Sequence, residues 1–238
     1  MKLKDKLILI TGASRGIGRA VALACAKEGA ELVITARTTA ALEELDDEIQ
    51  AIGGRSAIVE MDLTDRPAVG RLAAAIASRW GRLDGFVANA GQLGQLAPLP
   101  HSDPDIFDRT LQVNLSAVYD QIKALDPLLR RSEAGRAVLV SSSVAVQNRA
   151  FWGAYAISKA GLEAMGRIWA EESEQTHMKI NMLDPGGTAT AMRASAFPGE
   201  DADTLPSPAD IAPAFISLLS AECTYHGATL KARELAGL

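Results

Sequence analysis

The chain has 238 residues, 48% of them apolar, which can form one sizeable core and fits a single domain over residues 1–238. Its 24 basic and 29 acidic residues give a net charge of −5, which argues against nucleic-acid binding because that function needs a basic surface. No stretch reaches the ~18 apolar residues of a membrane-spanning helix, and the apolar run near the N-terminus is too short for a signal peptide. We therefore predict a cytoplasmic protein with no membrane partner.

Apolar, β-branched runs alternate with amphipathic stretches along the whole chain. The predicted strands are seven short runs, at 7–11, 31–36, 56–61, 84–89, 137–142, 179–183 and, more weakly, 228–232. The predicted helices between them include 39–52, 68–80, 104–129, which Pro127 ends or kinks, and 155–175. Strands that alternate with helices of this length indicate repeated βαβ units. We predict an α/β fold: a single doubly wound domain with a seven-stranded, mostly parallel sheet and helices on both faces.

Three glycines follow the first predicted strand, in the stretch TGASRGIG. Gly12, Gly16 and Gly18 are spaced G-x-x-x-G-x-G, which differs from the G-x-G-x-x-G of many dinucleotide sites. The physical purpose is the same: a tight turn, a close backbone approach and a helix N-terminus that faces an anion. Incidental glycines in an ordinary turn are the alternative. The position between a strand and a helix favours a dinucleotide whose pyrophosphate rests on this backbone.

Two arginines favour NADP(H) over NAD(H) as the cofactor. The second predicted strand ends at Arg37, where an NAD site has an acidic residue for the ribose 2′-hydroxyl, and Arg15 lies inside the glycine turn. Guanidinium groups match phosphate oxygens, so both suit a 2′-phosphate, unless Arg37 is simply solvated at a helix start. Asp62, after the third strand, either accepts the adenine amino group or caps the helix that begins near Asp65.

Tyr155 and Lys159 stand four residues apart in YAISK, so both side chains face the same side of a predicted helix. A phenol with a pKa near ~10 is a poor acid–base catalyst at neutral pH, and a neighbouring ammonium is expected to lower that pKa. Taken alone, such a pair is also typical of a surface contact. Ser142 ends the fifth predicted strand, where a hydroxyl can hold a substrate carbonyl against Tyr155, although Ser141 and Ser143 compete for the role.

Polar side chains also follow the fourth predicted strand. Asn89 and Gly91, in ANAG, lie at the carboxyl edge where doubly wound sheets bind ligands. Asn114 lies inside a predicted helix, where asparagine has poor propensity, so it either kinks the helix for a purpose or is a tolerated exposed residue. The three histidines and two cysteines have no metal-ligand spacing, and we predict no metal site.

These motifs occur in the order found in the short-chain dehydrogenase/reductase family, which the chain resembles over about residues 5–220. The resemblance implies a Rossmann-like fold and hydride transfer between a nicotinamide and a small-molecule carbonyl or alcohol. It also implies four catalytic roles. Tyr155 would donate the proton, Lys159 would modulate it and bind the cofactor ribose, Ser142 would orient the carbonyl, and Asn114 would hold a water of the proton relay.

The segment DPGGTAT matches the family's loop that flanks the nicotinamide. A closer resemblance, over SSSVAVQNRAFWGAYAISK, PGGTATAMRASAFP and PADI, is to the YciK-type oxidoreductases within the family and identifies no substrate. Family members commonly pair two long helices across subunits, so a homodimer or homotetramer is expected. Together, the motifs and the resemblance predict these cofactor-binding residues: Gly12, Ser14, Arg15, Gly16, Ile17, Gly18, Arg37, Asp62, Leu63, Asn89, Ala90, Gly91, Tyr155, Lys159, Pro185, Gly186, Thr188 and Thr190.

Three departures from the family pattern stand out. Ala88 replaces a common asparagine, at the expected loss of a structural hydrogen bond. Asp184 replaces a neutral residue before Pro185, which favours a cationic substrate unless the carboxylate faces a neighbouring loop. The C-terminus, HGATLKARELAGL, lacks the usual DGG, which puts the last strand in doubt.

Three segments are expected to form the walls of the substrate pocket: 92–99, 144–152 and 192–205, the last as a mobile lid. Trp152, Met192 and Phe197 suggest an apolar component. Arg149 and Arg193 either receive an anionic substrate or are solvated.

The sequence favours an NADP-dependent reductase. An NAD-dependent alcohol dehydrogenase and a non-catalytic NADP-binding sensor are the alternatives. A sensor has no need for the joint presence of the four expected catalytic residues.

Overall fold

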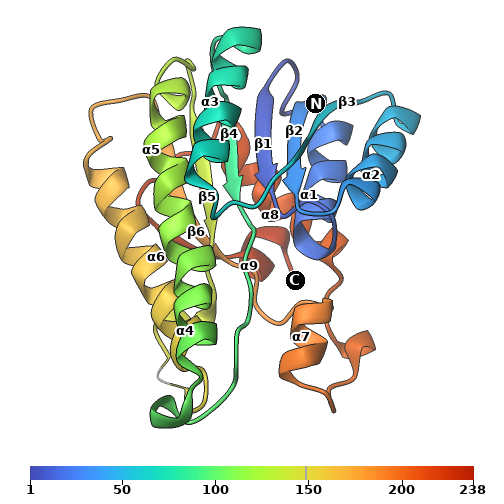
Figure 1. The fold of residues 1–238 in the computed structure, drawn as a ribbon. Coiled ribbons are helices and arrows are strands. Elements are labelled where there is room, and N and C mark those ends of the chain that lie inside the picture. Colours follow the sequence, from blue (N-terminus) through green and yellow to red (C-terminus); the bar gives the residue numbers. More distant parts are fainter. Residues whose placement is uncertain (148) are drawn as a thin grey trace.

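The computed structural model describes residues 1–147 and 149–238. Seven strands form one sheet in the order β3-β2-β1-β4-β5-β6-β7, and every pairing between neighbours is parallel (Figure 1). This topology confirms the predicted doubly wound α/β domain. The strands are β1 Leu7–Thr11, β2 Glu31–Ala36, β3 Arg55–Glu60, β4 Gly85–Ala88, β5 Arg136–Val140, β6 Lys179–Asp184 and β7 Thr229–Lys231.

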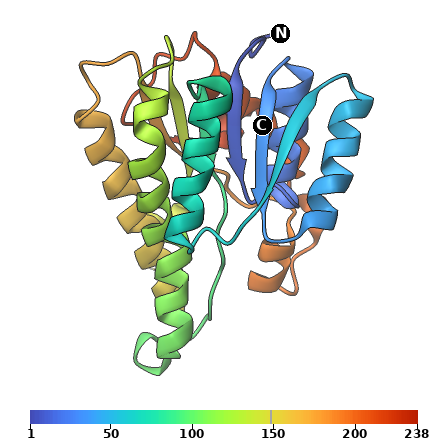
Figure 2. The ribbon, with the colours of Figure 1, turned by 45° about the horizontal axis from the view of Figure 1, so that its top comes forward.

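Helices cover both faces of the sheet. The helices α1, α2 and α8 pack on one face, and α3, α5 and α6 on the other (Figures 1 and 2). The helices are α1 Gly16–Lys27, α2 Thr39–Ala51, α3 Arg66–Trp80, α4 Pro104–Leu111, α5 Ala117–Leu129, α6 Gly153–Glu171, α7 Ala191–Ala196, α8 Pro208–Leu219 and α9 Ala232–Ala236. Among the described residues, no helix combines the length and apolar character needed to cross a membrane.

The central strands are apolar along their whole length because both faces of the sheet are covered. Alternate residues of β1 enter different cores: Ile8 and Ile10 pack under α1 and α8, and Leu9 packs under α3 and α5. Leu9 is paired with Val33 of β2 and Phe86 of β4, which belong to the same core. Two continuous cores thus fix the register of the sheet.

The predicted helix over 104–129 is divided into three parts. Between α4 and α5, residues Gln112–Ser116 form a π-helical segment that contains Asn114. Asn114 is completely buried, so the structure excludes the exposed alternative. Pro127 lies in the last turn of α5, and the helix ends shortly after it, at Leu129, as expected of a proline that cannot donate to the preceding turn.

The last strand forms despite the atypical C-terminus. Strand β7 pairs in parallel with β6, and α9 packs against α8. Strand β5 ends at Val140, two residues earlier than predicted, so Ser142 lies in the following turn. Helix α6 begins at Gly153 and ends at Glu171, again earlier than predicted.

The sheet reverses its winding direction between β1 and β4, where doubly wound folds bind ligands at the carboxyl ends of the strands. The glycine turn follows β1 and the ANAG segment follows β4, so both flank this switch point. In Figure 1, α4 and α7 extend beyond the carboxyl edge on opposite sides.

Candidate active site

The glycine turn joins β1 to α1 and contains two residues with left-handed backbone angles. Gly12 has φ +66° and Gly16 has φ +57°, a conformation that a residue with a side chain rarely adopts. A Cβ atom at Gly16 would meet only the Thr190 methyl group, at 3.6 Å, so this side of the turn is open. The N-cap residue Arg15 makes no side-chain capping bond, which leaves the first N–H groups of α1 without a side-chain partner.

Gly18 and Gly12 also allow protein segments to meet. A Cβ atom at Gly18 would overlap the Gly12 carbonyl and the Asn89 amide, and one at Gly12 would lie 2.9 Å from Ala90 Cα. The contact of these glycines with a pyrophosphate stays a prediction.

Asn89 holds the glycine turn against the end of β4. Its Nδ2 donates to the carbonyl oxygens of Thr11 at 2.9 Å and Gly12 at 3.2 Å. The backbone N–H groups of Asn89 and Ala90 donate to Thr11 Oγ1 at 3.1 and 3.2 Å. The neighbouring Ala88 is buried in the core. Asn89 thus shapes the turn from within the protein.

Two cations lie just beyond the carboxyl ends of β1 and β2. Arg15 and Arg37 are both exposed, and neither pairs with a carboxylate in the described part of the chain. Leu63 is buried, and Ile17 and Ala90 are half-buried against the two cores.

Asp62 does not cap α3, because Asp65 accepts the capping bond from the Ala68 N–H at 3.3 Å. Asp62 instead pairs with Arg109 Nη2 at 2.9 Å and accepts bonds from the N–H and hydroxyl of Thr64 at 2.9 and 2.7 Å. Burial raises the pKa of Asp62, but the Thr64 and Arg109 contacts outweigh it and lower that pKa to about 2. The carboxylate is therefore ionised at neutral pH.

Tyr155 and Lys159 occupy consecutive turns at the start of α6, and both are buried. Burial raises the pKa of Tyr155 to about 12, although a hydrogen bond with Ser142 opposes the change. Burial lowers the pKa of Lys159 to about 8. Lys159 Nζ lies 5.8 Å from the Tyr155 ring centroid and donates to the Val140 carbonyl at 2.7 Å. The expected lowering of the Tyr155 pKa by Lys159 is absent, because burial dominates.

The three serines after β5 point to different partners. Ser141 is buried and donates to Glu163 Oε1 at 2.6 Å. The Ser143 backbone lies close enough to Asp184 to lower the pKa of that carboxyl, and the Ser142 side chain lies close enough to Tyr155 to lower the pKa of the phenol. Ser142 is therefore the serine in position to act with Tyr155.

Asn114 ties the segment after β4 to helix α6. Its Oδ1 accepts from the Gln92 N–H, and its Nδ2 donates to the Gln92 carbonyl, both at 2.9 Å. The Nδ2 also donates to Ser158 Oγ at 3.0 Å, and Ser158 donates to the Tyr155 carbonyl at 2.7 Å. A Cβ atom at Gly91 would come within 3.2 Å of Asn114 Oδ1. Asn114 thus reaches the catalytic helix through Ser158.

Sequence reasoning missed two residues of this centre, Ser158 and Glu163. Both are buried, and Glu163 also pairs with Arg167 at 3.1 Å. Residues 155, 158, 159 and 163 share one face of a helix, so helical spacing from Tyr155 could have indicated them.

The loop expected to flank the nicotinamide is held by its own hydrogen bonds. Thr188 Oγ1 donates to the Pro185 carbonyl at 3.2 Å, and Thr190 caps α7 by accepting from the Arg193 N–H at 3.2 Å. Gly186 has φ +69°. Arg233 of α9 donates to the Gly187 carbonyl, so the C-terminal helix supports this loop.

Asp184 faces neighbouring loops. It accepts bonds from the N–H groups of Gly186, at 2.9 Å, and Ser143. Burial raises the pKa of Asp184, although these bonds oppose the rise. The structure therefore supports the loop alternative for this carboxylate over a role toward a cationic substrate.

The segments expected to form the pocket walls meet at the carboxyl edge. The Ala97 N–H donates to the Phe151 carbonyl at 3.0 Å, which joins the first two walls. The third wall contains most of α7. An ion pair within this segment joins Arg193 Nε to Glu200 Oε2 at 2.5 Å. The motion of this segment as a lid stays a prediction.

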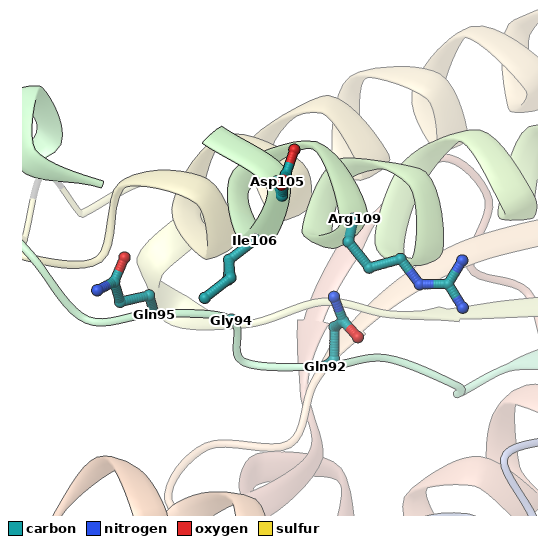
Figure 3. A pocket seen from close by; sticks show the side chains of 6 residues that line it. All are labelled: Gln92, Gly94, Gln95, Asp105, Ile106 and Arg109. Carbon is teal, nitrogen blue, oxygen red and sulfur yellow. The ribbon is translucent and has the colours of Figure 1, made fainter. Parts of the chain in front are cut away.

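A cavity of about 560 Å³ lies between the segment after β4 and α4 (Figure 3). Ile106 and Arg109 extend from α4 toward this segment. None of the four expected catalytic residues lines the cavity, but Arg109 connects it to Asp62 and Gln92 connects it to Asn114. The lining residues are Gln92, Gly94, Gln95, Asp105, Ile106 and Arg109.

Comparisons with known proteins agree with the geometry. The short chain dehydrogenase family model matches residues 6–201. The uncharacterized oxidoreductase YciK of Escherichia coli K12 is 42% identical over 220 residues, which cover 91% of this chain and 87% of YciK. A short chain dehydrogenase from Shigella flexneri 2a strain 301, complexed with NADP, superposes with a TM-score of 0.94 at 39% identity, covering 98% of each chain. One from E. coli CFT073, complexed with NADPH, gives 0.94 at 41% identity and the same coverage.

Proposed function

The chain belongs to the short-chain dehydrogenase family, and on this basis we propose that it is an NADP(H)-dependent reductase of small-molecule carbonyl compounds. The observation that carries the proposal is the placement of the buried Tyr155 and Lys159 on consecutive turns of α6, with Ser142 close enough to Tyr155 to lower its pKa. This arrangement can hold a carbonyl oxygen and supply it with a proton.

The residues at the switch point fit a phosphorylated dinucleotide. The open side of the glycine turn and the uncapped start of α1 offer N–H donors to a pyrophosphate. The unpaired Arg15 and Arg37 suit the additional negative charge of a 2′-phosphate. The NADP and NADPH complexes of two relatives support the same choice.

The residues of the site account for the proton in the reaction. When bound, the reduced nicotinamide supplies a hydride to the carbonyl carbon. Tyr155, whose pKa of about 12 keeps it protonated at neutral pH, transfers its proton to the carbonyl oxygen while Ser142 holds that oxygen. The product is an alcohol, and the charge left on the Tyr155 oxygen is stabilised by the nearby Lys159 ammonium until a proton from solvent replaces the one transferred. We keep the proposal that Asn114 holds a water molecule through which a proton from solvent reaches Tyr155.

Two other readings make different predictions for the same protein. An NAD-dependent alcohol dehydrogenase requires a preference for NADH over NADPH. A non-catalytic NADP-binding sensor requires binding without turnover. We also expect a cytoplasmic homodimer or homotetramer, because α5 and α6 expose apolar side chains at Tyr119, Ile157 and Ile168.

Titration with NADPH and NADH, followed by reduced-nicotinamide fluorescence, tests the cofactor. We expect NADPH to bind at least about ten-fold more tightly, since a charge-assisted phosphate contact is lost with NADH. Arg37→Ala should remove most of this preference, while Arg79→Ala, at the far end of α3, should keep it. Tighter binding of NADH than of NADPH would favour the NAD-dependent alternative, and failure of both to bind would refute the oxidoreductase proposal.

A further inference from the structure

A third apolar cluster lies outside the two cores of the domain. Val144, Trp152 and Tyr155 are its buried members, and Leu93 and Phe197 pack against them. These residues come from the three segments that follow β4, β5 and β6. The cluster therefore gathers all three expected pocket walls around the proposed proton donor.

Aromatic rings lead outward from Tyr155 through this cluster. The Tyr155 and Trp152 rings meet edge to face with centroids 5.9 Å apart, and the Phe197 ring lies 5.7 Å beyond Trp152. A flat or extended apolar molecule with its carbonyl at Tyr155 would pack against the partly buried members of the cluster, Leu93 and Phe197.

Arg149 stands at the outer end of the aromatic rings. Its guanidinium carbon lies 5.2 Å from the Trp152 centroid and 4.8 Å from the Phe197 centroid. Stacking on rings restrains a guanidinium while leaving its N–H donors at the edge available to a ligand. No carboxylate among residues 1–147 and 149–238 pairs with Arg149.

The other charged groups around the cluster already have protein partners. Arg193 also stacks on Phe197, at 3.7 Å, but Glu200 neutralises it through two hydrogen bonds of 2.5 and 2.6 Å. Arg233 donates to the Gly187 carbonyl. Asp184 accepts backbone N–H groups. Among the described residues, Arg149 is the exposed cation of this region that no carboxylate matches; the buried Lys159 also lacks a carboxylate but belongs to the proposed proton-transfer group.

We infer that Arg149 is a specificity-determining residue that binds an anionic group of the substrate. The inference rests on the proposed carbonyl reduction at Tyr155. It defines the substrate class as a carbonyl compound with an aromatic or extended apolar body and a carboxylate distal to the carbonyl. Guanidinium groups bind carboxylates through paired N–H donors, so the contact fixes orientation as well as affinity.

The test compares an acid with its neutral ester. NADPH oxidation is measured with 4-carboxybenzaldehyde and with methyl 4-formylbenzoate, for the wild type and for Arg149→Met, which keeps an unbranched side chain but removes the charge. We expect the wild type to favour the acid by about ten-fold or more in kcat/KM, mainly through KM, as one charge-assisted contact implies. Arg149→Met should lose that preference, with its kcat/KM for the acid no higher than that for the ester.

Arg79→Met is the matched control, because Arg79 also stacks on a tryptophan, 4.3 Å from the Trp80 centroid, but far from the site. It should behave as the wild type does. Equal kcat/KM for acid and ester in the wild type, or an unchanged preference in Arg149→Met, would overturn the role of Arg149 and leave the reductase proposal intact.

A binding measurement separates the two proposals if neither aldehyde is reduced. Calorimetry of the NADP⁺-loaded protein with biphenyl-4-carboxylate and its methyl ester needs no turnover. Tighter binding of the acid by about ten-fold, lost in Arg149→Met, would support Arg149 as the anion receptor while the absent turnover counts against the reductase. Equal binding of acid and ester would overturn the role of Arg149.

Discussion

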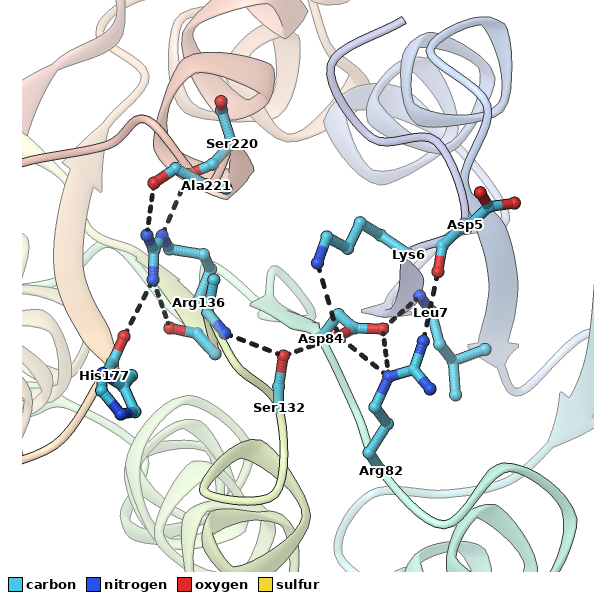
Figure 4. A network of polar contacts seen from close by, with 12 residues as sticks. Asp5, Lys6, Leu7, Arg82, Asp84, Ser132, Arg136, His177, Ser220 and Ala221 are labelled. Carbon is cyan, nitrogen blue, oxygen red and sulfur yellow. Dashed lines mark hydrogen bonds and ion pairs between the residues drawn. The ribbon is translucent and has the colours of Figure 1, made fainter.

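The two ends of the strands differ in whether their charged side chains have partners within the protein. At the amino edge, Arg136 is 4% exposed and donates to the carbonyl oxygens of Ser220, Ala221 and His177 at 2.9, 2.8 and 3.1 Å (Figure 4). Nearby, Asp84 is 2% exposed and accepts from the Leu7 N–H at 2.9 Å and other donors. The protein itself supplies partners for the buried charges at this edge.

At the carboxyl edge, several arginines and the first N–H groups of α1 have no side-chain partner among the described residues. Arg15, Arg37 and Arg149 pair with no carboxylate of the described residues, and no side chain caps α1. Burial raises the pKa of Tyr155 and lowers the pKa of Lys159, so it disfavours the charged form of each side chain. The comparison teaches that the amino edge is built for stability and the carboxyl edge for ligands.

The largest expected effect is a loss of catalytic activity in Tyr155→Phe with little change in the stability of the fold. Tyr155→Phe removes the proton donor and should lower kcat/KM for aldehyde reduction by about 10²–10⁴-fold, the usual range for a general acid. The free energy of unfolding should change by less than about 1 kcal/mol, since one hydrogen bond to Ser142 is lost. Steady-state kinetics and urea denaturation measure both. A variant that keeps full activity would exclude Tyr155 as the donor.

A substitution of the buried arginine at the amino edge should lower stability more than a substitution at the carboxyl edge. Arg136→Leu leaves several buried carbonyl oxygens without donors and should lower the free energy of unfolding by about 3 kcal/mol. Arg149→Met, at the other edge, should change it by less than about 0.5 kcal/mol. Urea denaturation compares the two. Similar losses from both variants would contradict the distinction between the edges.

A smaller effect concerns the dependence of stability on pH. The pKa of Lys159 falls from its ordinary 10.5 to about 8 in the folded protein, so the unfolded chain binds more protons between these values. The contribution of Lys159 to stability therefore rises with pH across this window, and below it the buried ammonium carries a penalty on the order of 3 kcal/mol. In Lys159→Met this rise should be absent, and the variant should be the more stable of the two near neutral pH. Thermal unfolding at pH 7 to 10 measures the difference, and an identical pH profile for both proteins would contradict it.

The strands could be predicted from the sequence because a parallel sheet buries both faces. Runs such as LILIT and ELVITA therefore have no charged residue in their interior, and β1 and β2 have the predicted bounds. Arg136 escaped notice for the same reason, since a charge beside an apolar run resembles the end of a strand. Its partners follow α6 and α8, far away in the sequence.

The site was predicted in outline and differs in its details. Local motifs identified Tyr155, Lys159 and Ser142, because their roles depend on spacing along one helix and on the edge of one strand. The pairing of Asp62 with Arg109 and the contact of Gly18 with Asn89 join distant segments, which spacing does not reveal. The pKa of Tyr155 depends on burial, which is a property of the whole fold.

The π-helical segment around Asn114 constrains how this gene can change. Such a segment is equivalent to one residue inserted into an ordinary α-helix. Deleting a single codon within it would restore regular α-helical winding and leave α4 and α5 in their present orientation, because the wide turn already absorbs the extra residue. The wide turn that carries Asn114 would be lost, and with it the position of this side chain between Gln92 and Ser158. A single deletion here should therefore cost the candidate site more than the fold.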